Sequence, residues 1–247
     1  MFSLFDQQCI DLLLAFPNYG SRVCFESALH HLECAQKIIF IDPAMAKFRV
    51  LTAEEEAASG LMYCLKEMSF SNSELLKPKD HKYKNGIIPF FRIFGLFFRE
   101  KQSSIIQEPK LHIDEGVKKR LFIEFKMIVN GSPSWFRPEP PLGIYMGNTD
   151  GEAETFEDQI NSFADMHGVK KVFDYIERQA NVRNELLYAG KNGYPKRALF
   201  ENNDFHAKEE VVLNMLKVYL LIRPYNKNEL PFVQNSLDCY LRIINNR

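Results

Sequence analysis

An excess charge of one sign and a long apolar run are both missing from this sequence. Its 31 lysines and arginines face 32 aspartates and glutamates, so the formal net charge is -1. No overall field therefore draws the molecule to nucleic acid or to a membrane. No stretch of about 18 residues is free of charge, and residues 1–16 carry Asp6 and Asp11 but no basic residue, unlike a signal peptide. We expect a soluble protein that makes no contact with a membrane.

Paired cysteines and the common cofactor motifs are missing too. The five cysteines are scattered and contain no C-x-x-C pair, which argues against a zinc or redox site. Reduced, mostly buried thiols in a cytoplasmic protein are the expectation. Glycine-rich nucleotide-binding loops, G-x-S-x-G and H-E-x-x-H are absent. We therefore expect no cofactor and no metal.

The length and composition favour one large globular domain. The chain has 247 residues, 46% of them hydrophobic, and its one unusual feature is 21 phenylalanines against a single tryptophan. Apolar periodicity predicts a mainly α (α+β) protein. In this prediction a helical bundle is built from 1–75 and 152–247, and 76–151 is an inserted basic, Phe-rich segment with a small β hairpin.

Two helices are predicted to form an N-terminal hairpin. The first covers about 22–40, is capped by Ser21 and ends at Asp42-Pro43. The second begins at Thr52, where Thr52-x-x-Glu55 matches a capping box. The small residues at 57–60 would let a neighbouring helix approach closely. Further helices are predicted over about 153–166, 168–188, 206–223 and 229–245.

The middle of the chain differs in character. Seven basic residues between 77 and 101 flank five phenylalanines within 90–98. Such a stretch could bind single-stranded nucleic acid by stacking and phosphate contact, but Phe-rich segments more often form core. Alternation over 120–129 predicts a strand, Asn130-Gly131 a turn, and 142–146 a short return strand.

One candidate site joins the two N-terminal helices. His31 lies at the edge of the first apolar stripe, and Glu54 occupies the matching end of the second. We expect the two side chains to meet across the hairpin, either as a buried hydrogen bond or as part of an active site. Two inward polar groups are too few for a catalytic metal, which needs three protein ligands.

A second candidate is Arg183. On a helix it falls near the middle of an apolar stripe, where a guanidinium needs an acidic partner, a subunit interface or an anionic ligand. The alternative is that the helix bends or ends near Asn181, which frees Arg183 to reach solvent.

The residues around Arg183 resemble a known signature. The sequence Arg183-Asn-Glu-Leu-Leu-Tyr188 is similar to that of HEPN-domain proteins, in which an arginine, usually followed by a polar residue such as Asn184, precedes a histidine by four to six positions. The run Ala-Glu-Glu-Glu-Ala-Ala-Ser-Gly at 53–60 is similar to the abortive-infection branch. The resemblance covers 22–69 and 168–245, and it departs from the pattern at Tyr188, which stands where the family has histidine.

The resemblance implies a helical, commonly dimeric protein of phage-defence or toxin-antitoxin type. It also implies metal-independent RNA cleavage, in which the 2'-hydroxyl attacks the adjacent phosphate. Arg183 could clamp that phosphate, but Tyr188 is a poor base at pH 7. Catalysis is therefore lost, or another residue, such as His31, supplies the base. The alternative function is a non-enzymatic interaction protein with Arg183 at a homodimer interface.

Overall fold

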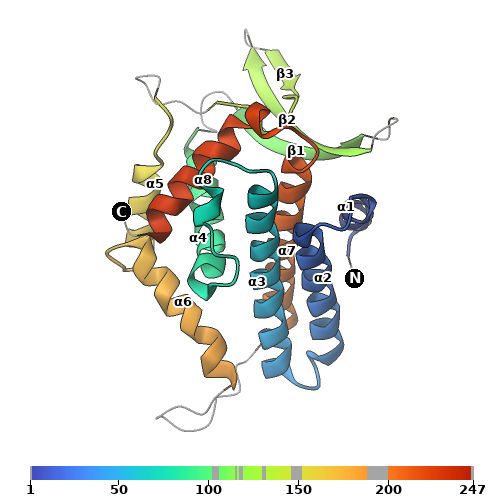
Figure 1. Cartoon of the computed structure of the whole chain (residues 1–247), viewed down its shortest axis with the longest axis vertical. Helices are drawn as coiled ribbons and strands as arrows, with labels where there is room; N and C mark the ends of the chain where they lie inside the picture. The colour runs from blue at the N-terminus through green and yellow to red at the C-terminus, as the bar shows by residue number, and fades with distance from the viewer. Residues whose placement is uncertain are drawn as a thin grey trace.

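A mainly helical chain with one small antiparallel sheet is the architecture of the computed structural model (Figure 1). The structure describes residues 2–101, 106–114, 116, 119–129, 132–145, 152–187 and 200–245. The expected fold class is thereby confirmed. The elements are α1 (Leu4–Ala15), α2 (Gly20–Ile38), α3 (Pro43–Glu67), α4 (His81–Lys101), β1 (Ile106–Asp114), β2 (Arg120–Val129), β3 (Ser132–Phe136), α5 (Glu157–Met166), α6 (Val172–Leu187), α7 (Asn202–Ile222) and α8 (Pro231–Ile244), with short 3₁₀ turns at Ser73–Leu75 and Lys227–Glu229.

The central helix is α3, which contacts α2, α4, α6 and α7. Figure 1 shows α2, α3 and α7 standing side by side, with the sheet lying across one end of the bundle. The core is thus assembled from both ends of the chain. This arrangement surrounds α3 so completely that even polar residues along it are buried.

Small residues allow α2 and α3 to pack closely, as the sequence predicts. At Gly60 a Cβ atom would lie 2.7 Å from the Phe25 ring and 3.1 Å from the carbonyl oxygen of Ser21. Phe25 is itself fully enclosed, and its ring centroid lies 5.0 Å from that of Tyr219 on α7. Glycine at this position therefore leaves room for the Phe25 ring, which packs between α3 and α7.

The predicted start of α3 and the predicted cap of α2 are wrong. Asp42 caps α3 by accepting a hydrogen bond from the Met45 backbone (3.0 Å), and Pro43 occupies the first turn, where its missing N–H costs nothing. Thr52 lies inside α3, and its hydroxyl donates to the Phe48 carbonyl. Ser21 is likewise inside α2, since the helix already begins at Gly20.

The Phe-rich stretch forms the helix α4, and its apolar face lies in the core. Phe90, Phe94 and Phe97 are buried, and the last two pack against the ring of Phe156, which precedes α5. The basic residue Arg92 is exposed on the same helix. The core interpretation of these phenylalanines is confirmed.

The sheet has the order β1-β2-β3, with both pairs antiparallel. The predicted strand at 120–129 is confirmed by β2, whereas the turn at Asn130-Gly131 lies outside the described residues. The return strand is 132–136 rather than 142–146. Residues 142–145 follow two consecutive prolines and form no strand; Leu142 packs against the core, whereas Tyr145 is exposed.

The four C-terminal helices match their predicted ranges within a few residues. Helix α7 begins four residues earlier than predicted, at Asn202, because Glu201 and Asp204 form a reciprocal capping box there. All five cysteines are free thiols, as expected.

Candidate functional site

Two adjacent glutamates, Glu54 and Glu55, are buried in the middle of α3, each only 5% exposed. Their neighbours Ala53, Ala57 and Ala58 are also buried, because helices cover α3 on several sides. A carboxylate removed from water requires a charged or hydrogen-bonding partner. The structure supplies different partners to the two residues.

Glu54 pairs with Lys208 on α7. The Lys208 ammonium donates to both carboxylate oxygens, at 2.9 and 2.8 Å. Burial raises the pKa of Glu54, while the positive charges of Lys208 and Arg92 oppose that rise. The pair therefore links the N-terminal and C-terminal parts of the bundle through a carboxylate that burial makes easier to protonate.

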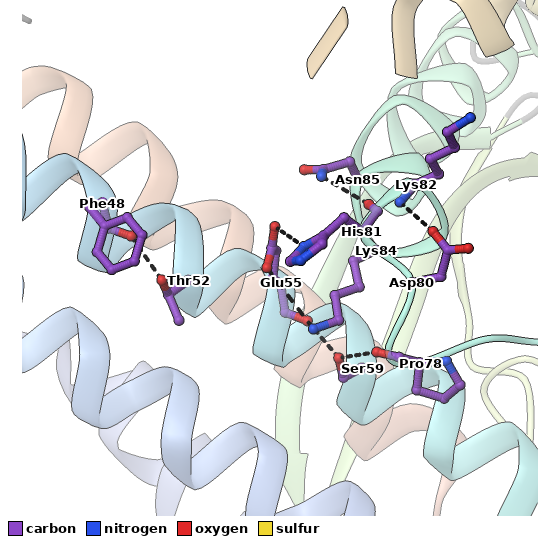
Figure 2. A network of polar contacts seen from close by, with 10 residues as sticks. All are labelled: Phe48, Thr52, Glu55, Ser59, Pro78, Asp80, His81, Lys82, Lys84 and Asn85. Carbon is purple, nitrogen blue, oxygen red and sulfur yellow. Dashed lines mark hydrogen bonds and ion pairs between the residues drawn. The ribbon is translucent and has the colours of Figure 1, made fainter. Parts of the chain in front are cut away.

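Glu55 faces the start of α4 (Figure 2). Its Oε1 lies 3.0 Å from Nδ1 of His81, and its Oε2 lies 4.0 Å from Nζ of Lys84. Because a carboxylate accepts hydrogen bonds, we assign the proton of the neutral His81 ring to Nδ1, which leaves Nε2 as the acceptor. The His81 side chain is 51% exposed although Glu55 is buried. His81 is therefore a partly solvent-exposed histidine whose ring is oriented by a buried carboxylate.

The position of His81 is fixed by contacts on both sides of it. Asp80 accepts a hydrogen bond from the Lys82 backbone at 2.9 Å, and the Asn85 amide donates to the His81 carbonyl at 2.9 Å. The segment before α4 is tied to α3, because the Ser59 hydroxyl lies 3.0 Å from the Pro78 carbonyl (Figure 2). The histidine is thus presented from a well-anchored helix start.

Helix α6 runs past this histidine. Lys82, the next residue along α4, forms an ion pair with Glu177 on α6 and lies 5.2 Å from the ring of Phe173. Arg183 is six residues further along α6, about 9 Å along its axis. Because α6 also contacts α3, Arg183 is carried by a helix that packs against the helix bearing Glu54 and Glu55.

The resemblance to HEPN proteins rests on residues at the end of this helix. Arg183 and Asn184 belong to α6, but their side chains are not among those that the structure describes. Tyr188 lies outside the described residues. The roles expected of these three residues therefore remain predictions.

The expected contact between His31 and Glu54 is replaced by two separate contacts. No hydrogen bond joins these two described residues; His31 instead lies 3.2 Å from Arg49, measured from Nδ1 to Nη1. Arg49 and Glu54 are five positions apart on α3, which is about 140° around the helix. The face that meets α2 is therefore the face of Arg49, and Glu54 points toward α7.

Sequence reasoning did not single out His81, Lys84 or Lys208. His81 and Lys84 lie in the basic stretch 77–101, for which the sequence allows either core packing or contact with nucleic acid. Asp80, a residue type that favours helix starts, is the one local indication of a helix there. No sequence pattern around Lys208 predicts its pairing with Glu54, because that pairing depends on the packing of α7 against α3.

The described residues contain no group of three or more histidine, cysteine or acidic side chains arranged to hold a metal ion. Within the same part of the chain, no helix has both the length and the apolar composition that crossing a membrane requires. Comparison with known proteins adds no relative, since no family model, no curated protein and no solved structure matches this chain.

Proposed function

We propose that this protein is a HEPN-like, RNA-directed protein of phage-defence or toxin type, and that it cleaves RNA without a metal. The observation that favours this function is the His81–Glu55 pair beside α6. His81 supports the proposal as a candidate base in a chain whose motif position carries Tyr188 instead of histidine.

The proposed chemistry needs a base, an acid and a cation. His81 Nε2 accepts the proton of the RNA 2'-hydroxyl, and the 2'-oxygen forms a bond to the adjacent phosphorus. The bond to the 5'-oxygen breaks, and that oxygen takes a proton from a second donor, for which Tyr188 is a candidate. Glu55 accepts the hydrogen bond from Nδ1 of His81 and so orients the ring, and Arg183 neutralises the phosphate. The products are a 2',3'-cyclic phosphate and a 5'-hydroxyl.

The test is RNA cleavage by the purified protein in the presence of EDTA. We expect His81→Ala and Arg183→Ala each to lower the rate at least about 100-fold, with the far-UV circular dichroism spectrum unchanged. His206→Ala is the matched control, because His206 is a solvent-exposed histidine that also pairs with a glutamate, Glu209. A 2'-deoxy substitution at the cleaved position should block the reaction. Unchanged rates in both variants, or an absolute need for a divalent metal, would contradict the proposal.

A second candidate function is a non-enzymatic interaction protein. It is favoured by Phe40 and Ile41, which lie next to each other in the turn between α2 and α3 and are 83% and 82% exposed. Exposed apolar residues grouped in this way mark contact surfaces. If they hold a homodimer together, replacing both by serine should shift the wild-type sedimentation coefficient to that of a monomer. A wild type that is monomeric at every concentration would count against this function.

A further inference from the structure

An apolar cavity of about 270 Å³ lies between the helical bundle and the sheet. Its walls come from α3, α4, α7 and α8 on one side and from β1, β2 and the segment around Leu142 on the other. It is partly open to solvent. Neither Glu55 nor His81 lines it, so the cavity is distinct from the Glu55–His81 site at the start of α4.

The lining is chemically uniform. Among the described residues that line the cavity, only Ser236 and Tyr240 carry side-chain oxygen atoms. Both hydroxyls are already engaged: Ser236 donates to the Phe232 carbonyl at 2.6 Å, and Tyr240 donates to the carbonyl of Tyr83. No described lining side chain is therefore left in need of a polar ligand group.

Such a space favours a hydrocarbon occupant over water. A water molecule in a cavity needs two to four polar partners, and apolar cavities without them stay dry and take up apolar molecules instead. An empty space also deprives its lining atoms of dispersion contacts. An occupant made of CH₂ and CH₃ groups restores those contacts without leaving a polar group unpaired.

The volume sets the size of the occupant. A cavity of about 150 Å³ is known to bind benzene, which has six carbon atoms, so a space of about 270 Å³ suits a molecule of about ten carbon atoms. The partial opening allows one end of a chain to reach solvent. We propose that this cavity is a binding site for a single medium-length alkyl chain, inserted between the bundle and the sheet.

The chain could belong to a neutral lipid-like molecule or to a fatty acid, and both share the buried hydrocarbon. Calorimetric titration of the full-length protein with 1-decanol and, separately, with decanoate distinguishes them. Saturable binding of either at one site per chain is expected. Equal affinities mean that the hydrocarbon alone is recognised, and tighter binding of decanoate identifies a fatty acid. If neither compound binds saturably, the proposal is wrong.

Variants that fill the cavity with a larger side chain provide the structural control. Val218 on α7 is half-buried and lines the cavity, whereas Val211, two turns earlier, is half-buried and packs against the core elsewhere. We expect Val218→Phe to weaken binding at least tenfold and Val211→Phe to leave it unchanged. Ser236→Leu, which fills the same space from α8, should also weaken binding and serves if Val218→Phe does not fold. Equal affinity in wild type and both filling variants would overturn the assignment, whatever the outcome of the RNA cleavage test.

Discussion

Lys208 and Glu54 are 154 positions apart in the sequence, yet the Lys208 ammonium donates to both oxygens of the Glu54 carboxylate. The carboxylate is buried, and about a third of the lysine side chain is exposed. Removing one partner of such a pair leaves an uncompensated charge in the interior, which costs far more than the pair itself contributes.

Replacing Lys208 by methionine should therefore lower the free energy of unfolding by about 3 kcal/mol at neutral pH. Urea denaturation followed by circular dichroism measures this change. Lys37→Met, at an exposed position near the end of α2, is the control and should change stability little. A loss below about 0.5 kcal/mol for Lys208→Met would show that the pair is not needed.

The same variant should regain stability in acid. Burial raises the pKa of Glu54 in the folded protein above its usual value. A raised carboxyl pKa stabilises the fold below the usual pKa of the unfolded chain, and this contribution is lost as the pH rises through the folded value. Without Lys208 the pKa of Glu54 rises further, so the defect should be larger at pH 7.5 than at pH 5. Adding Glu54→Gln should remove this pH dependence.

Two glycine-to-alanine substitutions should have opposite effects. At Gly60 the added methyl group meets the enclosed Phe25 ring and the Ser21 carbonyl, so we expect a loss of about 1–3 kcal/mol. At Gly95, on an exposed part of α4, a Cβ atom meets nothing within 4 Å. Alanine there should stabilise the helix by about 0.5–1 kcal/mol. Thermal melts of the two variants test the α2–α3 contact directly, and equal shifts would contradict it.

Helix α2 depends on a residue of α3 for its cap. The Glu67 carboxylate accepts hydrogen bonds from the Ser21 backbone (3.0 Å) and from its hydroxyl (2.6 Å), which satisfies one of the free N–H groups at the helix start. Glu67→Ala should lower the free energy of unfolding by about 1 kcal/mol. Glu33→Ala, at an exposed position of α2, should have little effect. Equal losses in these two variants would assign the effect to charge rather than to capping.

Thiol reactivity should separate the cysteines. Burial raises the pKa of Cys9 and Cys239 to about 11 and that of Cys64 to about 12, and thiolates are the reactive form. In the native protein at pH 8 these three should react with Ellman's reagent only on unfolding. Cys34 is partly exposed, and Cys34→Ser should remove the fastest phase. A fast phase that survives this substitution would locate accessible thiols elsewhere.

Periodicity was sufficient to predict the helical class, the strand at 120–129 and the C-terminal helices, because each buries one regular face. It misplaced the start of α3 by nine residues, since Asp42-Pro43 can end one helix or begin the next and Thr52-x-x-Glu55 matched a capping box by chance. Glu54 could be selected as an inward polar residue. Its partner Lys208 and the His81–Glu55 pair could not, because they depend on how α7 and α4 dock against α3, which local spacing does not encode.

The central position of α3 also has a consequence for synthesis of the chain. At 5–20 residues per second, the ribosome adds Lys208 about 8–30 s after Glu54. During that interval the buried carboxylates of α3 have neither α7 nor its lysine to cover them. The central helix of the nascent chain must therefore stay partly hydrated until α7, in the last quarter of the chain, has been made. Any truncation before α7 should leave a protein that chaperones and proteases recognise.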